Sequence, residues 1–234
     1  MFPVAILAGG LALRLRPITE TIPKALVDVA GKPFIIRQLN YLHQQGINQV
    51  VLCVGYLEDM IQDVVGTGQR FGLNVTYSSD GSVLLGTGGA LKKALPLLGQ
   101  DFFILYGDTF LPINFAAVQK AYEISAKLGL MSILKNNDKW DKSNVCYANG
   151  MLLEYNKCAV HSGMNYIDYG LGIVSAAVFD QYPSDRPFDL ADVYQDLSFH
   201  GHLEGFEVYE RFYEIGSHTG LREAEEYFLT KEKV

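Results

Sequence analysis

The chain has 234 residues, 49% of them hydrophobic, and its formal net charge is −7 at pH 7 with a pI near 5.2. This length and composition are enough for one sizeable domain with a buried core. The acidic balance argues against a protein that coats nucleic acid, because such proteins present a basic surface to phosphate. No segment reaches the roughly 20 apolar residues of a membrane helix. Since the N-terminus also lacks a secretory pattern, we expect a cytoplasmic protein that contacts no membrane.

The first half of the chain alternates apolar runs with helical patterns. The predicted strands are Pro3–Ala8, Gln49–Val54, Asn74–Ser78 and Phe102–Tyr106. The predicted helices are Phe34–Gln45, which Gly46 ends, Leu57–Val65, Gly89–Leu98 and Asn114–Lys127. This alternation is typical of a parallel sheet whose strands are joined by crossover helices.

The second half has shorter strands and a mixed pattern. Its predicted strands are Leu130–Leu134, Ser143–Tyr147, Met151–Tyr155 and Gly172–Ser175, and its predicted helices are Leu190–Phe199 and Gly220–Lys233. The chain contains no repeat, low-complexity tract or Pro/Gly linker. We therefore expect one domain over residues 1–234, with one half at about 1–112 and the other at about 113–234.

Cysteine and histidine spacings predict neither disulfides nor a metal site. Cys53, Cys146 and Cys158 are widely separated and form no C-x-x-C pair, so we expect free, buried thiols. His200 and His202 alternate as two side chains on one strand face would, and we interpret them as surface residues.

A glycine pair follows the first predicted strand directly. Gly9 and Gly10 let the chain turn sharply at the carboxyl end of a parallel sheet, where open α/β folds bind ligands. Arg14, Arg16 and Lys24 then supply fixed positive charge in an otherwise acidic protein. The loop matches neither G-x-G-x-x-G nor a Walker loop. It nevertheless predicts a phosphate site.

The segment LAGGLALRLRPIT, followed by Pro23 and Lys24, resembles the signature of the sugar nucleotidyltransferase family, commonly L-A-G-G-x-G-T-R-L-x-P-x-T and then P-K. The resemblance implies a Rossmann-like three-layer α/β/α fold of the GT-A type with a mostly parallel central sheet. It assigns the following residues to the triphosphate: Leu7, Ala8, Gly9 and Gly10 as nucleotide-binding, and Arg14 and Lys24 as catalytic. Ala12 and Leu13 replace the usual Gly-Thr. The Cβ of Ala12 narrows the range of backbone conformations at that position, and Leu13 lacks the threonine hydroxyl.

Further motifs resemble the same family in the same order. LGTGGA supplies Gly86, Thr87 and Gly88, where a base and ribose can approach the backbone closely. Asp108 matches the aspartate that binds Mg²⁺ in the family and is also assigned to catalysis, although a plain Gly-Asp turn is the alternative. In YEIGSHTGL, Glu214 stands where a second metal-binding aspartate is usual, with a structural role as its alternative.

Two motifs are assigned to the sugar 1-phosphate by the resemblance. LLEYNKC is similar to F-x-E-K-P and places Asn156 and Lys157 at the sugar phosphate. YIDYG stands where the family often has I-N-A-G, so Asp168 is a candidate for contact with sugar hydroxyls or the metal. The half at about 1–112 is thus expected to bind nucleotide and the half at about 113–234 to bind sugar phosphate.

The implied reaction is nucleotidyl transfer from a nucleoside triphosphate to a sugar 1-phosphate, with Mg²⁺ as cofactor and pyrophosphate as product. Chain length and LGTGGA resemble the mannose- or heptose-1-phosphate guanylyltransferase group, which uses GTP. Thymidylyl-, uridylyl- and cytidylyltransferases share the layout. Two other classes stay open: a glycosyltransferase, although the usual Asp-x-Asp pair is not found at Asp108, and a non-catalytic nucleotide-sugar-binding module. A homodimer is a further option.

Overall fold

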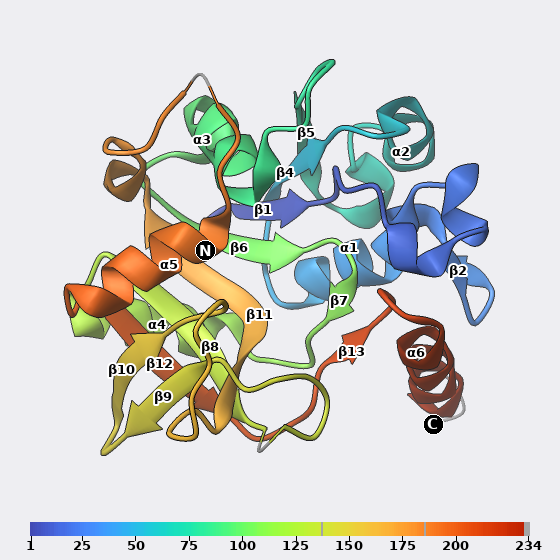
Figure 1. Ribbon diagram of the computed structural model, residues 1–234. Coiled ribbons are helices and arrows are strands. Elements are labelled where there is room, and N and C mark those ends of the chain that lie inside the picture. The colour runs from blue at the N-terminus through green and yellow to red at the C-terminus, as the bar shows by residue number, and fades with distance from the viewer. Residues whose placement is uncertain (137, 185, 232–234) are drawn as a thin grey trace.

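The computed structural model describes residues 1–136, 138–184 and 186–231, and a nine-stranded sheet runs through its middle (Figure 1). The strands of this sheet are β1 (Val4–Leu7), β4 (Gln49–Val54), β5 (Asn74–Ser79), β6 (Asp101–Tyr106), β8 (Gly129–Lys135), β9 (Val145–Ala148), β10 (Met151–Tyr155), β11 (Tyr166–Ser175) and β12 (Leu203–Val208). Two small sheets pair β2 (Asp28–Val29) with β3 (Lys32–Pro33), and β7 (Thr109–Phe110) with β13 (Tyr213–Glu214). The helices are α1 (Phe34–Gln44), α2 (Glu58–Val65), α3 (Gly86–Leu98), α4 (Phe115–Ser125), α5 (Leu190–Phe199) and α6 (His218–Lys231).

Four parallel strands form one side of the sheet in the order β6-β1-β4-β5. The chain leaves β1 toward β4 and β5 and returns on the other flank of β1 as β6, which makes a topological switch point at β1. Ligands bind open α/β sheets at the carboxyl edge beside such a point. On the far side of β6, β11 runs antiparallel to both β6 and β8, so the second half of the chain continues the same sheet.

Helices cover both faces of the sheet, as the sequence pattern predicts. On β1, Val4 and Ile6 belong to one core cluster and Ala5 belongs to the other, because side chains alternate along a strand. Helices α1, α2 and α4 complete the first cluster, and α3 and α5 complete the second. Each fully buried aliphatic side chain contributes roughly 1.5–3 kcal/mol of transfer free energy. Because helices cover both faces of the sheet, the three-layer α/β/α architecture is confirmed.

The last helix packs against the first part of the chain as well as against its neighbour β13. Figure 1 shows α6, in dark red, next to β13. In α6, Phe228 contacts Phe110 of β7 with ring centroids 4.8 Å apart, and Ile215 joins Val29 and Phe34 in a third core cluster. The C-terminal segment thus crosses the boundary expected near residue 112. This crossing brings Glu214 to the turn that carries Asp108.

Most predicted elements are present, and the differences lie at their ends and in short strands. Helix α3 begins at Gly86 instead of Gly89, and β11 begins at Tyr166 instead of Gly172. The sequence pattern did not predict β12 or the two-residue strands β2, β3, β7 and β13. Helix α6 starts two residues before the predicted Gly220, and its predicted end at Lys233 lies outside the described residues.

Two expectations about single residues need correction. Cys53 is buried, but Cys146 is half-buried and Cys158 is exposed, so burial of the thiols holds for Cys53 alone. His200 and His202 are both exposed, as expected, yet His200 follows α5 and His202 precedes β12, so they do not share a strand face. Among the described helices, none has both the length and the apolar character to cross a membrane.

Candidate active site

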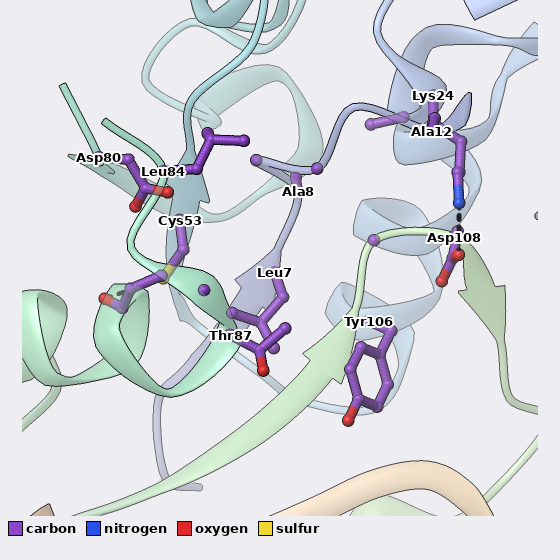
Figure 2. Close-up of a pocket in the computed structure, with 16 residues that line it drawn as sticks. Leu7, Ala8, Ala12, Lys24, Cys53, Asp80, Leu84, Thr87, Tyr106 and Asp108 are labelled. Atoms are coloured by element: carbon purple, nitrogen blue, oxygen red, sulfur yellow. Dashed lines mark hydrogen bonds and ion pairs between the residues drawn. The ribbon is translucent and has the colours of Figure 1, made fainter. Parts of the chain in front are cut away.

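The carboxyl ends of the four parallel strands open into a cavity of about 220 Å³ (Figure 2). The residues assigned from the sequence that line it are Leu7, Ala8, Gly9, Gly10, Lys24, Gly86, Thr87 and Asp108. They come from loops far apart in the sequence that meet because parallel strands bring their carboxyl ends to one edge. In Figure 2, Asp80, Leu84 and Cys53 lie at one end of the cavity, and Lys24 and Asp108 lie at the other.

The glycine loop after β1 contains a strained alanine. Ala12 has φ 51° and ψ 44°, the left-handed conformation that costs a residue with a Cβ about 1 kcal/mol and that glycine adopts freely. The Thr19 hydroxyl donates to the Ala12 carbonyl at 2.8 Å and so closes the loop. Leu13 and Arg14 follow in a 3₁₀ turn (Leu13–Leu15), both exposed. The backbone therefore keeps the shape that a glycine at position 12 would favour.

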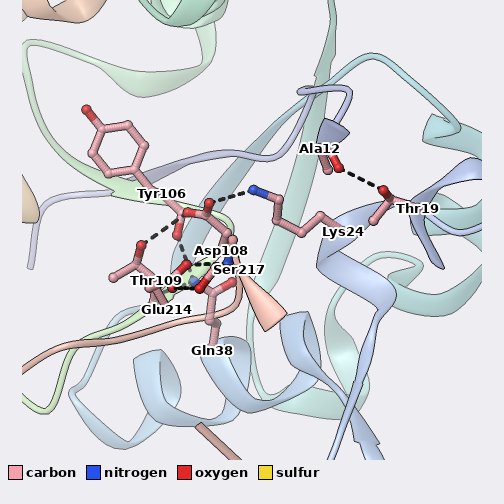
Figure 3. A network of polar contacts seen from close by, with 10 residues as sticks. Ala12, Thr19, Lys24, Gln38, Tyr106, Asp108, Thr109, Glu214 and Ser217 are labelled. Atoms are coloured by element: carbon pink, nitrogen blue, oxygen red, sulfur yellow. Dashed lines mark hydrogen bonds and ion pairs between the residues drawn. The ribbon is translucent and has the colours of Figure 1, made fainter. Parts of the chain in front are cut away.

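Asp108 lies on a turn that passes very close to β1. The Gly107 amide donates to the Leu7 carbonyl at 2.9 Å, and a Cβ on Gly107 would lie 2.8 Å from that same oxygen, so only glycine fits here. The Lys24 ammonium donates to Asp108 Oδ2 at 2.8 Å (Figure 3). Both side chains are partly exposed, at 20% and 28%, so this ion pair contributes no more than about 1 kcal/mol to stability.

Arg14 and Glu214 reach the same point from opposite ends of the sequence. A Cβ placed on Gly216 would lie 2.7 Å from Glu214 Oε2, 3.3 Å from Arg14 Nη2 and 3.4 Å from Asp108 Oδ2. A guanidinium group and two carboxylates therefore surround Gly216. Glu214 also binds its own loop, because the Gly216 amide donates to Oε2 and the Ser217 hydroxyl donates to Oε1 at 2.6 Å.

The chemistry of this junction suits a divalent cation that binds together with phosphate. Mg²⁺ is usually held by one or two carboxylates together with substrate oxygens and water. Within residues 1–136, 138–184 and 186–231, no group of three or more His, Cys, Asp or Glu could hold a metal ion. Asp108 and Glu214 would therefore supply only part of the ligands, and the Lys24 ammonium already shows that a cation can lie against Asp108.

Asp80 and Cys53 form the other end of the cavity. Asp80 follows β5, and its Oδ2 accepts a hydrogen bond from the Leu85 amide at 3.2 Å. Burial raises the pKa of Asp80 above its usual value, while the Leu85 hydrogen bond and the charge of Lys93 act against this rise. Burial also raises the pKa of the Cys53 thiol to about 12, so the thiol is neutral at pH 7 and acts as an apolar wall.

Thr87 connects the cavity to the second half of the chain. Its hydroxyl donates to Asp189 Oδ1 at 2.7 Å, and the Lys157 ammonium lies 3.7 Å from Asp189 Oδ2. Lys157 is exposed, so this contact does not fix its position. Asn156 accepts hydrogen bonds from the amides of Cys158 and Ala159 at 3.1 and 2.8 Å, and in this way shapes the turn that carries Lys157.

Asp168 lies on β11 at a break in the strand register. Its Oδ1 accepts a hydrogen bond from the Gly170 amide at 2.9 Å, and its own amide donates to Asn144 Oδ1 at 3.0 Å. Burial raises the pKa of Asp168 to about 6, and the Gly170 hydrogen bond and the charge of Lys157 oppose that rise. Its charge also acts on Tyr106, which lines the cavity, although Asp168 itself is not among the lining residues.

Gly88 is the one assigned glycine of the LGTGGA motif that lies outside the cavity lining. Its amide donates to the Phe188 carbonyl at 3.0 Å, and a Cβ here would fall 2.3 Å from the Phe188 ring. This close packing is also the reason that α3 can begin three residues earlier than the sequence predicts, since Phe188 covers its first turn.

Several residues at the site were not assigned from the sequence, among them Asp80 and Tyr106 in the cavity lining and Gln38 behind it. Asp80 follows a parallel strand just as Asp108 does, and this position is a usable signal. Gln38 is a buried polar residue that lies three positions after Ile35 and four before Leu42, on the apolar face of the predicted helix. Polar residues at such positions are candidates for a specific hydrogen-bonding role.

Comparisons with known proteins show the family to which the chain belongs. Residues 4–142 match the family model described as nucleotidyl transferase. N-acetylmuramate alpha-1-phosphate uridylyltransferase of Neisseria meningitidis is 34% identical over 227 residues, covering 94% of this chain and 95% of that protein. D-glycero-alpha-D-manno-heptose 1-phosphate guanylyltransferase of Aneurinibacillus thermoaerophilus is 30% identical, with 94% and 95% covered. The crystal structure of HddC from Yersinia pseudotuberculosis complexed with GMP-PN superimposes with a TM-score of 0.83 at 28% identity, over 97% of this chain and 100% of that one. This chain belongs to the nucleotidyl transferase family.

Proposed function

We propose that the protein transfers a nucleotidyl group from a nucleoside triphosphate to a sugar 1-phosphate and releases pyrophosphate. The observation that carries this proposal is the cavity at the carboxyl edge, which has the glycine loop on one side and the Lys24–Asp108 pair at its end. The relatives named above support it, since both curated proteins are sugar-1-phosphate nucleotidyltransferases by name.

In the proposed reaction, an oxygen of the sugar phosphate attacks the α-phosphorus of the triphosphate. A new P–O bond forms to this oxygen as the bond between the α-phosphorus and its bridging oxygen breaks, and that oxygen leaves with pyrophosphate. The sugar phosphate is already anionic, so the step needs no general base. Positioning and charge neutralisation account for most of such catalysis. Gly9 and Gly10 would bring backbone amides to the triphosphate, and Arg14 and Lys24 would offset its charge.

The enzymes of this family generally use a divalent metal ion. We assign Mg²⁺ to Asp108, with Glu214 as the second carboxylate, because both approach Gly216. When bound, the ion would neutralise charge that develops on the phosphates. Lys24 would then leave Asp108 and pair with a phosphate oxygen.

The sugar 1-phosphate would bind on the side of β11 and the turn after β10. Lys157 is exposed and able to pair with the sugar phosphate, and Asn156 shapes its turn. Asp168 would accept hydrogen bonds from sugar hydroxyls. A cytoplasmic location and a homodimer stay predictions.

We propose GTP as the triphosphate because of Asp80 at the base end of the cavity, and mannose- or heptose-1-phosphate as the sugar substrate because chain length and LGTGGA resemble that group. Asp80 presents a carboxylate there, and guanine has two neighbouring donors, N1–H and the N2 amino group, that match it. Uracil and thymine place a single donor between two acceptors, which fits a carboxylate less well. A uridylyltransferase is nevertheless a second candidate, because the Neisseria relative acts with that base by its name.

Pyrophosphate release from each of the four triphosphates, measured with a panel of sugar 1-phosphates, tests the proposed function. We expect release that requires both substrates and is largest with GTP. Tight triphosphate binding without release from any pair would instead support a non-catalytic module. Transfer of a sugar from a nucleotide sugar to an acceptor would support a glycosyltransferase.

A further inference from the structure

Gln38 binds both ends of the turn that carries Asp108. Its side chain is buried in α1, with 2% of the residue exposed. Nε2 donates one hydrogen bond to the Tyr106 carbonyl at 2.9 Å and another to the Thr109 carbonyl at 2.8 Å (Figure 3). These two carbonyls flank Gly107 and Asp108, so one amide nitrogen uses both of its hydrogens to hold the turn.

The acceptor end of the same side chain is not satisfied. Gln38 Oε1 is buried and has no hydrogen-bond partner among the described residues. Rotating the amide by 180° would place this oxygen against the two carbonyls and lose both hydrogen bonds. A leucine or methionine would fill the space without leaving a buried acceptor unpaired. The two donated hydrogen bonds are therefore the physical reason for an amide at this position.

Other backbone contacts hold the turn on its remaining sides. The Ile215 amide donates to the Asp108 carbonyl at 2.9 Å, and the Gly107 amide donates to the Leu7 carbonyl at 2.9 Å. Gln38 is the side chain that joins the two ends of this turn. Asp108 is thereby fixed to α1, β1 and the segment before α6.

We infer that Gln38 is a positioning residue, which orients Asp108 through the turn and does not contact substrate itself. This inference rests on the proposed role of Asp108 as a metal-binding carboxylate. Groups that orient a metal ligand typically change metal affinity or activity by about 10- to 100-fold when they are replaced. Removal of the Gln38 donors should therefore weaken metal binding in the triphosphate complex.

The test compares Gln38→Met with Gln45→Met. Both glutamines lie at α1, and Gln45 Oε1 accepts a hydrogen bond from the Phe115 amide at 3.3 Å, away from the cavity. Mn²⁺ binding is measured by electron paramagnetic resonance with saturating triphosphate and no sugar phosphate, and stability is measured by urea unfolding. We expect Mn²⁺ affinity to fall about tenfold or more in Gln38→Met and to stay unchanged in Gln45→Met. The kcat should fall, while the KM for sugar phosphate stays the same.

Unchanged Mn²⁺ affinity in Gln38→Met would overturn the inference. If Gln38→Met does not fold, Gln38→Glu keeps the size and polarity of the side chain but can donate to at most one carbonyl, so its Mn²⁺ affinity should also fall. Wild-type affinity in that variant would likewise reject the positioning role. A wild-type protein that binds no Mn²⁺ with any triphosphate and releases no pyrophosphate would instead reject the proposed function.

Discussion

An isosteric substitution tests the proposed role of the Asp108 carboxylate in turnover. Asp108→Asn keeps the size of the side chain but removes its negative charge, so it should lower turnover by roughly two or more orders of magnitude. The pair with Lys24 is partly exposed, and stability should therefore change by no more than about 1 kcal/mol. Pyrophosphate release and urea unfolding measure the two effects.

Asp101→Asn is a matched control for this variant. Asp101 starts β6, whereas Asp108 follows its other end, and the Asp101 carboxylate accepts a hydrogen bond from the Tyr122 hydroxyl at 2.7 Å. Turnover should stay close to the wild-type value in Asp101→Asn. Near-normal turnover in Asp108→Asn would remove this residue from the proposed metal site.

The raised pKa of Asp168 predicts a pH-dependent stability. Burial raises this pKa from its ordinary value of 3.8 to about 6, so the folded protein binds a proton more tightly than the unfolded chain does. The resulting stabilisation is complete below pH 3.8 and is lost as the pH rises through about 6. The difference in unfolding free energy between Asp168→Asn and the wild type should shift in favour of the variant by roughly 2 kcal/mol between pH 4 and pH 7, because one pKa unit corresponds to about 1.4 kcal/mol. Parallel curves of unfolding free energy against pH would contradict this prediction.

The strained backbone at Ala12 predicts that a glycine at this position stabilises the protein. Ala12→Gly relieves the left-handed conformation and should raise the free energy of unfolding by up to about 1 kcal/mol. Because position 12 lies in the cavity wall, the KM for the triphosphate should fall as well. Ala126 has the same left-handed conformation at the end of α4, far from the loop in sequence. Ala126→Gly should raise stability to a similar extent and leave that KM unchanged.

At the scale of single residues, sequence motifs predicted many of the residues that line the cavity but not the residues that support them. The glycine loop, Lys24 and Asp108 are found because each type of residue has its own chemistry at the end of a strand. Gln38 was not found, since a single glutamine on the apolar side of a helix gives no indication of which backbone groups it will meet. Its partners, the carbonyls of Tyr106 and Thr109, are about 70 residues away in the chain.

Among the elements, the start of α6 depends on Glu214. This carboxylate accepts hydrogen bonds from the Gly216 amide and the Ser217 hydroxyl, and Ser217 Oγ in turn accepts one from the Gly220 amide at 3.0 Å. Glu214→Ala should therefore cost about 1–2 kcal/mol of stability, comparable to the loss of a helix cap. If Glu214 also binds the metal, a Mg²⁺ titration of turnover should shift to higher concentration.

Glu223→Ala, a variant within α6, is the control for Glu214→Ala. Glu223 pairs with Arg211, a contact of partly exposed side chains. This variant should leave the Mg²⁺ titration unchanged. An unchanged titration in Glu214→Ala, together with lower stability, would assign Glu214 a structural role alone.

Element prediction succeeded where local pattern decides and failed where distant pairing decides. β4, β10 and α5 have the predicted bounds, because apolar periodicity and flanking turn residues mark their ends. The two-residue strands β7 and β13 exist only through their pairing with each other, across about 100 residues of sequence. No local pattern can indicate such a strand.

For the whole molecule, we propose that the chain unfolds as one unit. One sheet continues through both halves at β11 and β6, and α6 returns to the first part of the chain. Trp140 is the single tryptophan and packs against Phe212 with ring centroids 6.1 Å apart, so its fluorescence reports on the second half. Urea unfolding followed by this fluorescence should coincide with unfolding followed by far-UV circular dichroism.

Addition of the preferred triphosphate provides the control for this experiment. A ligand that binds the native state stabilises every part of a cooperative unit equally. The tryptophan transition should therefore move with the circular dichroism transition, although the cavity lies in the other half. Two separated transitions, or a shift in only one, would mean that the halves near residue 112 unfold independently.

The contact between Lys24 and Asp108 also affects the order in which ligands bind. In the free protein the ammonium acts as an internal counter-ion for this carboxylate. A lone Mg²⁺ would have to displace that counter-ion and leave it without a partner, whereas a triphosphate brings the anionic groups that can receive it. The metal should thus enter together with its nucleotide, and the resting enzyme should respond little to the free Mg²⁺ concentration around it.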